Sequence, residues 1–318
     1  MPLEKEYDAI LDRNQHKKDF ETHFADAGIL LKDLVNYGSN LIPRCFTSSE
    51  RKLKDAIIIG AFLKQVVSMA DGAEIQISNA ALYSANLQIR AGFEASICID
   101  WLIQKDTENK AKYFYISNLR KDKLWAQRVT GESPDQQAFE TIAKELNENL
   151  LIQPDEIKEE AKKRIQDIDN LLSRDTYKDI NDNFQDYISR RRISYEPSWF
   201  NVYGVQSVRQ MAKKVERLPE YEFLYSITSE VMHASSYRHH FQFKKDELVF
   251  IPIRYLKEIK TLINFIVSCT LKTYMNILNY YRPTEIPAFR RKYAEDWRDP
   301  FLNAKSVEYG QPNKKLKL

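Results

Sequence analysis

Glycine and proline are scarce in this sequence, with 8 glycines and 11 prolines among 318 residues. So few turn-forming residues argue against a many-stranded β fold and favour long helices. The three cysteines, Cys45, Cys98 and Cys269, stand far apart, and neither a CxxC nor an HExxH motif is present. We therefore expect no zinc site, and no other metal or cofactor.

Neither a strong net charge nor a long apolar run is present. The net charge is +3, which gives no strong global field toward nucleic acid or membrane. The longest apolar stretches, residues 56–70 and 261–281, are interrupted by lysine or polar residues and fall short of the roughly 20 residues that span a bilayer. Residues 1–18 lack the apolar core of a signal peptide. We therefore expect a cytoplasmic protein that does not enter a membrane.

Apolar residues recur at three- and four-residue steps over most of the chain, which predicts α-helices. Gly38 and the pair Asp71-Gly72 are expected to end the first two of them. Alternation over residues 241–253 predicts one hairpin or extended link. The fold class is thus all-α, a multi-helix bundle with a charged helical insertion and at most one short β-hairpin. The predicted helices cover residues 20–37, 48–69, 79–105, 111–129, 134–150, 154–174, a start at Ser207, 220–236 and 254–281.

The charge pattern predicts three parts of the chain. Residues 1–18 form a polar N-terminal segment, and residues 283–318 form an irregular C-terminal tail. Between them we expect a single helical domain, residues 19–282, with a charged insertion at about 110–192. Within that insertion, residues 154–174 are rich in Glu, Lys and Asp but keep apolar residues at helical spacing, as in an exposed amphipathic helix.

Arg90 and Glu94 lie one turn apart on the most apolar predicted helix. Burying such a pair is costly unless the charges are paired and hydrogen-bonded. Two interpretations remain open. The pair could be a buried ion pair that sets helix register, or it could line a pocket together with a polar partner from another helix.

That partner is expected from Tyr225, Ser229 and His233, whose spacing of four residues places them on one helix face. His233 could act as an acid or base near neutral pH. A single histidine on a helix is more often a packing residue, so a buried polar network remains the alternative to a site.

Basic clusters offer a further hypothesis. Arg190-Arg191-Arg192 and the group Arg44, Arg51, Lys52 and Lys54 could contact phosphates, although such runs usually form a solvated face.

Four stretches of the sequence resemble a known family. They read EPSWF from Glu196, SVRQMAK from Ser207, YEFLYSITSEVMHAS from Tyr221 and IRAGFEASICIDWL from Ile89. Together they resemble bacterial helical domains of unknown function of the 5677 type, over about residues 30–280 and most strongly over 197–235. The resemblance implies an all-helical fold and brings no established activity. It implies motif positions at Arg90, Glu94, Trp199, Arg209, Tyr221, Tyr225, Ser229 and His233.

A weaker likeness is to small metal-independent ribonucleases of bacterial toxin and defence systems. Their motif places an arginine before a histidine on one helix, with four to six residues between them. Here the order is reversed, because His233 precedes Arg238, and Arg90 lies far upstream.

Three functions follow as hypotheses. The first is binding of a polar or anionic ligand, a nucleotide or RNA, in a pocket between the two helices. The second is metal-independent RNA cleavage by a toxin-type or phage-defence effector, with His233 as general acid/base and Arg90 stabilising the phosphorane. The third is a scaffold that recruits a protein partner through residues 110–192, and a homo-oligomer is left open. The candidate catalytic residues are His233, Arg90, Glu94, Tyr225 and Ser229, and the candidate ligand contacts are Trp199, Arg209, Tyr221 and Arg238.

Overall fold

The computed structural model describes residues 10–47, 53–130, 134–145, 155–233, 237, 240–244 and 247–307. The predicted all-α fold class is confirmed. The chain divides into two compact units. The first unit comprises Met1–Lys105 and Val208–Leu318, and the second unit comprises Asp106–Ser207. The predicted insertion at about 110–192 falls within the second unit, and the predicted domain boundaries stay predictions.

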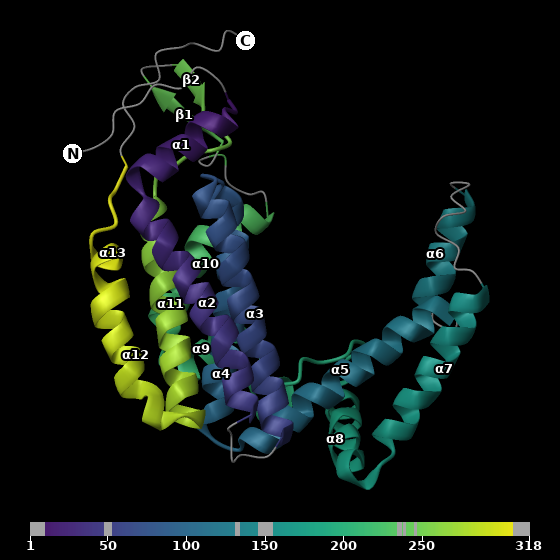
Figure 1. Cartoon of the computed structure of the whole chain (residues 1–318). Helices are drawn as coiled ribbons and strands as arrows, with labels where there is room; N and C mark the ends of the chain where they lie inside the picture. The colour runs from purple at the N-terminus through teal and green to yellow at the C-terminus, as the bar shows by residue number, and fades with distance from the viewer. Residues whose placement is uncertain are drawn as a thin grey trace. The chain divides into compact units, whose positions relative to one another are not determined.

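The first unit is a helical bundle in which α2, α3, α4 and α11 lie side by side (Figure 1). Its central helix is α4, in which every residue from Ala95 to Leu102 is buried. The near-continuous apolar surface of this helix requires partners on several sides, which the neighbouring helices supply. The helices of this unit are α1 (Arg13–His23), α2 (Ala25–Thr47), α3 (Leu53–Ser78), α4 (Leu82–Gln104), α9 (Val208–Lys214), α10 (Leu218–His233), α11 (Ile259–Tyr281), α12 (Ile286–Lys292) and α13 (Arg298–Leu302).

Two predicted helix ends are wrong. Gly38 lies inside α2 and Gly72 lies inside α3. At Gly38 the absence of a side chain serves packing, because a Cβ there would lie 2.0 Å from the Tyr274 hydroxyl oxygen of α11. That hydroxyl is buried and donates to the Leu34 carbonyl at 2.9 Å. From the sequence alone, a glycine that makes room for a neighbouring ring cannot be distinguished from a glycine that ends a helix.

The predicted hairpin is present. Strands β1 (Phe241–Lys244) and β2 (Glu247–Phe250) pair antiparallel, with Phe241 opposite Phe250.

The prediction of an irregular tail is wrong for residues 283–302, which form a 3₁₀ turn (Pro283–Glu285), α12, a π-helical turn (Tyr293–Trp297) and α13. Tertiary contacts order this segment. The Trp297 ring packs edge-on against Tyr37 at 5.4 Å, and its Nε1 donates to Asp33 at 2.7 Å. Residues 308–318 lie outside the described residues.

The N-terminal segment is helical from Arg13, where Asp12 caps α1 by accepting from the Gln15 amide at 2.9 Å. The predicted polar segment 1–18 therefore overlaps α1, and its residues 1–9 lie outside the described residues.

The second unit has its own core. Tyr113 packs against Phe184 and Tyr203, and Arg120 makes a two-pronged ion pair with Glu196 at 2.5 and 3.0 Å. The unit contains α5 (Thr107–Thr130), α6 (Pro134–Glu145), α7 (Asp155–Leu172), α8 (Asp175–Arg191) and a 3₁₀ turn (Asn201–Tyr203).

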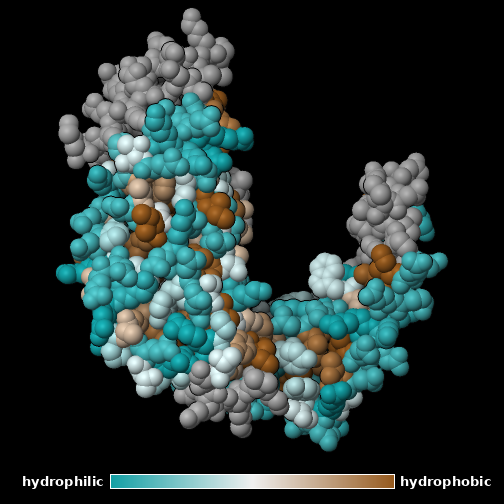
Figure 2. All heavy atoms as spheres, in the orientation of Figure 1, coloured by the Kyte–Doolittle hydropathy of each residue, from teal (hydrophilic) through white to brown (hydrophobic). Residues whose placement is uncertain are grey.

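One helix of the described residues is long and apolar enough to cross a membrane, the stretch Asp55–Ser78 within α3. It extends beyond the apolar run 56–70, because the helix continues through Gly72. Its most apolar window is 56% buried inside the protein, as is common for the core helix of a bundle. On the face seen in Figure 2, hydrophilic residues predominate and hydrophobic ones form small patches.

Candidate functional site

Helices α4 and α10 run antiparallel in the first unit. Arg217, just before α10, bonds to Asp100 near the C-terminal end of α4, and Tyr225 contacts Arg90 farther back along α4. This packing brings the two predicted helix faces into contact where Arg90 meets Tyr225.

Four of the predicted residues meet there, and we call Arg90, Glu94, Tyr221 and Tyr225 the arginine–tyrosine cluster. Arg90 Nε donates to Glu94 Oε1 at 3.1 Å, and its guanidinium carbon lies 4.4 Å from the centroid of the Tyr225 ring. The Tyr225 ring stacks on Tyr221 with centroids 5.3 Å apart and planes at 22°. Arg90 Nη1 is buried and has no hydrogen-bond acceptor among the described residues.

Electrostatics keep this cluster in a defined protonation state. Burial by itself would lower the pKa of Arg90, but the hydrogen bond and charge of Glu94, with the Tyr225 contact, raise the pKa above its usual value. Burial, and then the proximity of Tyr225 and Glu94, raises the pKa of Tyr221. The cluster therefore presents a permanent cation and a neutral phenol at neutral pH.

Ser229 and His233 continue along α10 away from the cluster. His233 is the last residue of α10, and at 1.5 Å per residue its backbone lies roughly 12 Å beyond Tyr225. Because the helices are antiparallel, this direction leads toward the N-terminal end of α4, whereas the Arg90 side chain bonds to Glu94 on the C-terminal side. The side chain of His233, and all of Arg238, lie outside the described residues.

The remaining two predicted residues have other surroundings. Arg209 Nε donates to Glu222 at 2.5 Å, and both side chains are exposed on α9 and α10 of the first unit. Trp199 belongs to the second unit, where its ring is buried and packs edge-on against Phe114 at 5.5 Å. Its ligand role stays a prediction.

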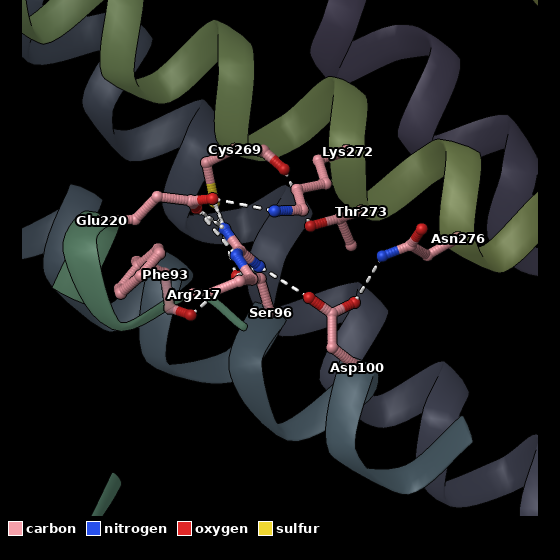
Figure 3. A network of polar contacts seen from close by, with 9 residues as sticks. All are labelled: Phe93, Ser96, Asp100, Arg217, Glu220, Cys269, Lys272, Thr273 and Asn276. Carbon is pink, nitrogen blue, oxygen red and sulfur yellow. Dashed lines mark hydrogen bonds and ion pairs between the residues drawn. The ribbon is translucent and has the colours of Figure 1, made fainter. Parts of the chain in front are cut away.

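A second polar constellation was not predicted. Arg217 is fully buried, and its polar contacts link α4, α10 and α11, as Figure 3 shows. Its Nη1 donates to Asp100 at 2.8 Å and to Ser96 at 2.9 Å, and its Nε donates to Glu220 at 2.7 Å. From α11, Asn276 donates to Asp100 at 2.7 Å and Lys272 donates to Glu220 at 2.8 Å.

One signal for this network was present in the sequence. Asp100 interrupts the apolar run from Ile97 to Leu102, and a carboxylate there requires a cation from elsewhere. The sequence does not indicate which cation supplies it. In the structure both Asp100 carboxylate oxygens are hydrogen-bonded, so Asp100 holds α4 to Arg217 and to Asn276 of α11.

The charged groups of this network stabilise one another's ionised forms. Burial by itself would lower the pKa of Arg217, but Cys269, Asp100 and Glu220 raise the pKa above its usual value. Burial would raise the pKa of Glu220, but Lys272 and Arg217 outweigh burial and lower the pKa.

Acidification is expected to destabilise the first unit partly through Glu220. Its folded-state pKa lies below 4.5, so its stabilising charge is present above that pH and is lost as pH falls through the folded value. Glu220→Gln should lower stability at pH 7 and flatten the acid side of the stability profile, measured by urea unfolding from pH 7 to pH 3. Glu21→Gln, at an exposed glutamate of α1, is the control. Parallel profiles for wild type and Glu220→Gln would contradict the expectation.

No group of three or more His, Cys, Asp or Glu residues within the described part of the chain could hold a metal ion.

Comparison with known proteins identifies the family. A model described as a family of unknown function, DUF5677, matches residues 55–248, more than half of the chain. The chain belongs to this family. The matched range contains both α4 and α10, so the arginine–tyrosine cluster lies inside it, and the resemblance predicted from the sequence is confirmed. No curated protein and no solved structure matches the chain.

Proposed function

We propose that this protein binds a nucleotide or a single-stranded RNA segment at the arginine–tyrosine cluster. The supporting observation is the position of the Arg90 guanidinium over Tyr225, whose ring stacks on Tyr221. Proteins commonly hold unpaired bases by stacking them on aromatic rings and arginine planes. The proposal agrees with a location in the cytoplasm, where RNA is abundant.

The polar groups of the cluster suit this ligand. Glu94 is about one-third exposed, and its carboxylate can accept from the amino group of a base. Arg90 is less exposed, and its guanidinium is a donor suited to a phosphate or base oxygen. Since Glu94 neutralises Arg90, stacking and hydrogen bonds rather than net charge would supply most of the affinity.

Binding is favoured over RNA cleavage for a geometric reason. Cleavage requires an acid/base and a phosphate-stabilising cation at one phosphate. The backbone of His233 lies two helical turns beyond Tyr225, and the Arg90 side chain is directed the other way, to Glu94. We therefore propose binding without turnover.

Arg90→Gln and Tyr221→Leu should each weaken RNA binding by roughly tenfold, because each removes a stacking or hydrogen-bonding contact. The measurement is fluorescence anisotropy with a labelled single-stranded oligoribonucleotide of mixed sequence, with circular dichroism to confirm folding. Arg164→Gln, at an exposed arginine paired with Asp122 in the second unit, is the control.

Two outcomes would overturn the proposal. The first is the absence of saturable binding by the wild type, or unchanged binding by both variants. The second is shortening of the oligonucleotide by the wild type but not by His233→Ala, which would select the cleavage hypothesis.

A further inference from the structure

The first unit contains a cavity that shares no lining residue with the arginine–tyrosine cluster. Its volume is about 560 Å³, within the range of roughly 300–1,000 Å³ typical of small-molecule sites. The walls are mostly apolar or aromatic. They include Tyr83, Phe250, Ile253 and Tyr255, and the charged residues Lys257 and Glu258 also line the cavity.

Hydrogen bonds between distant segments hold these walls in place. The Ile253 amide donates to the Ile10 carbonyl at 2.8 Å, and the Tyr255 amide donates to the Ala80 carbonyl at 3.0 Å. Arg254 Nη1 donates to the Asn79 carbonyl at 3.0 Å. The chain after β2 is thereby tied to the start of α4, so the cavity is formed before any ligand arrives.

Asn86 lines this cavity and carries an unsatisfied acceptor. The residue is only 6% exposed and is among those that line the space. Its Nδ2 donates to the Leu82 carbonyl at 3.0 Å, but its Oδ1 is buried and accepts no hydrogen bond from the described residues. A buried acceptor without a donor is unfavourable, and a donor supplied by a bound water or ligand would remove that cost.

We propose that this cavity binds a small, largely aromatic molecule that donates one neutral O–H or N–H to Asn86 Oδ1. Aromatic walls favour an aromatic ligand, because aromatic pairs contribute more than their buried area alone. A neutral donor fits because Asn86 Oδ1 is itself a neutral acceptor, and an ionised group would lose hydration at the apolar part of the wall. Burial, and then the charge of Glu258, raises the pKa of Tyr255 to about 12, so that wall also stays neutral.

The test compares 2-naphthol with 2-methoxynaphthalene, which has nearly the same shape but no hydroxyl donor. Wild-type protein should bind 2-naphthol roughly fivefold more tightly, the usual effect of one net hydrogen bond, as measured by titration calorimetry. Asn86→Leu should bind the two probes equally, because it lacks the acceptor. Asn118→Leu is the matched control, since Asn118 makes the same bond to a carbonyl one turn back but lies exposed in the second unit.

A second variant covers the case in which Asn86→Leu does not fold. Ile253 is 61% exposed at the cavity, so Ile253→Lys should be tolerated and should weaken both probes at least fivefold. The proposal is overturned if wild type binds neither probe saturably, or if Asn86→Leu keeps the preference for 2-naphthol. Unchanged binding by Ile253→Lys would also overturn it. RNA binding is a separate readout, so failure of either proposal is recognisable on its own.

Discussion

Replacing Arg217 with methionine should destabilise the first unit by about 3–5 kcal/mol, because Asp100 would keep its charge in the bundle without its cation. Methionine retains much of the side-chain volume, so the loss reflects charge more than a cavity. Ser96 would lose a donor as well. The measurement is urea unfolding followed by circular dichroism.

Two further variants separate the buried charge from a general effect of losing an arginine. Arg164→Met removes an exposed ion pair and should cost less than about 1 kcal/mol. The double variant Arg217→Met/Asp100→Leu should be less destabilised than the sum of its single changes, since no unpaired charge remains. Additive losses in this cycle would show that Arg217 and Asp100 do not depend on each other.

Gly38→Ala should destabilise the protein by about 2 kcal/mol or more, although alanine is the better helix former by about 1 kcal/mol. The new Cβ would lie 2.0 Å from the Tyr274 hydroxyl oxygen and 2.6 Å from a methyl carbon of Val67. Moving the ring would break its hydrogen bond to the Leu34 carbonyl. Thermal and urea unfolding would measure the loss.

Gly72→Ala is the matched control, because Gly72 also lies inside a helix. The three atoms nearest to a Cβ there belong to the Gln88 side chain, the first at 3.4 Å, which is ordinary contact. We expect unchanged stability or a gain of up to about 1 kcal/mol from helix propensity. If both glycine variants shifted stability equally, the packing explanation for Gly38 would be incorrect.

Local signals predicted much of the candidate site. Glu94 follows Arg90 by one helical turn, and this spacing alone predicts their contact on a single helix. The stacking of Tyr221 on Tyr225 was not predicted, because the sequence pointed to Tyr225, Ser229 and His233 as the shared face. The packing of α10 against α4 then decided which of these residues meet Arg90.

Two structural features were predicted wrongly because each depends on a residue that is distant in the sequence. Gly38 was predicted to end a helix, but its missing side chain admits Tyr274 of α11. The segment from 283 to 302 was predicted to be irregular, and the contacts of Trp297 with Tyr37 and Asp33 order it. In both cases the deciding partner lies more than 200 residues away.

The sequence by itself determined the all-α class, the hairpin at 241–250 and the pairing of Arg90 with Glu94 one helical turn apart, because each depends on neighbours along the chain. Only the tertiary structure decided that Arg217 supplies the cation for Asp100, 117 residues earlier, and that Asn86 lines a cavity with residues from 250 onward. Helical periodicity specifies which face is buried but not which other helix covers it. The antiparallel packing of α4 and α10 thus brought Arg90 to Tyr225 and placed the His233 backbone two turns beyond that contact.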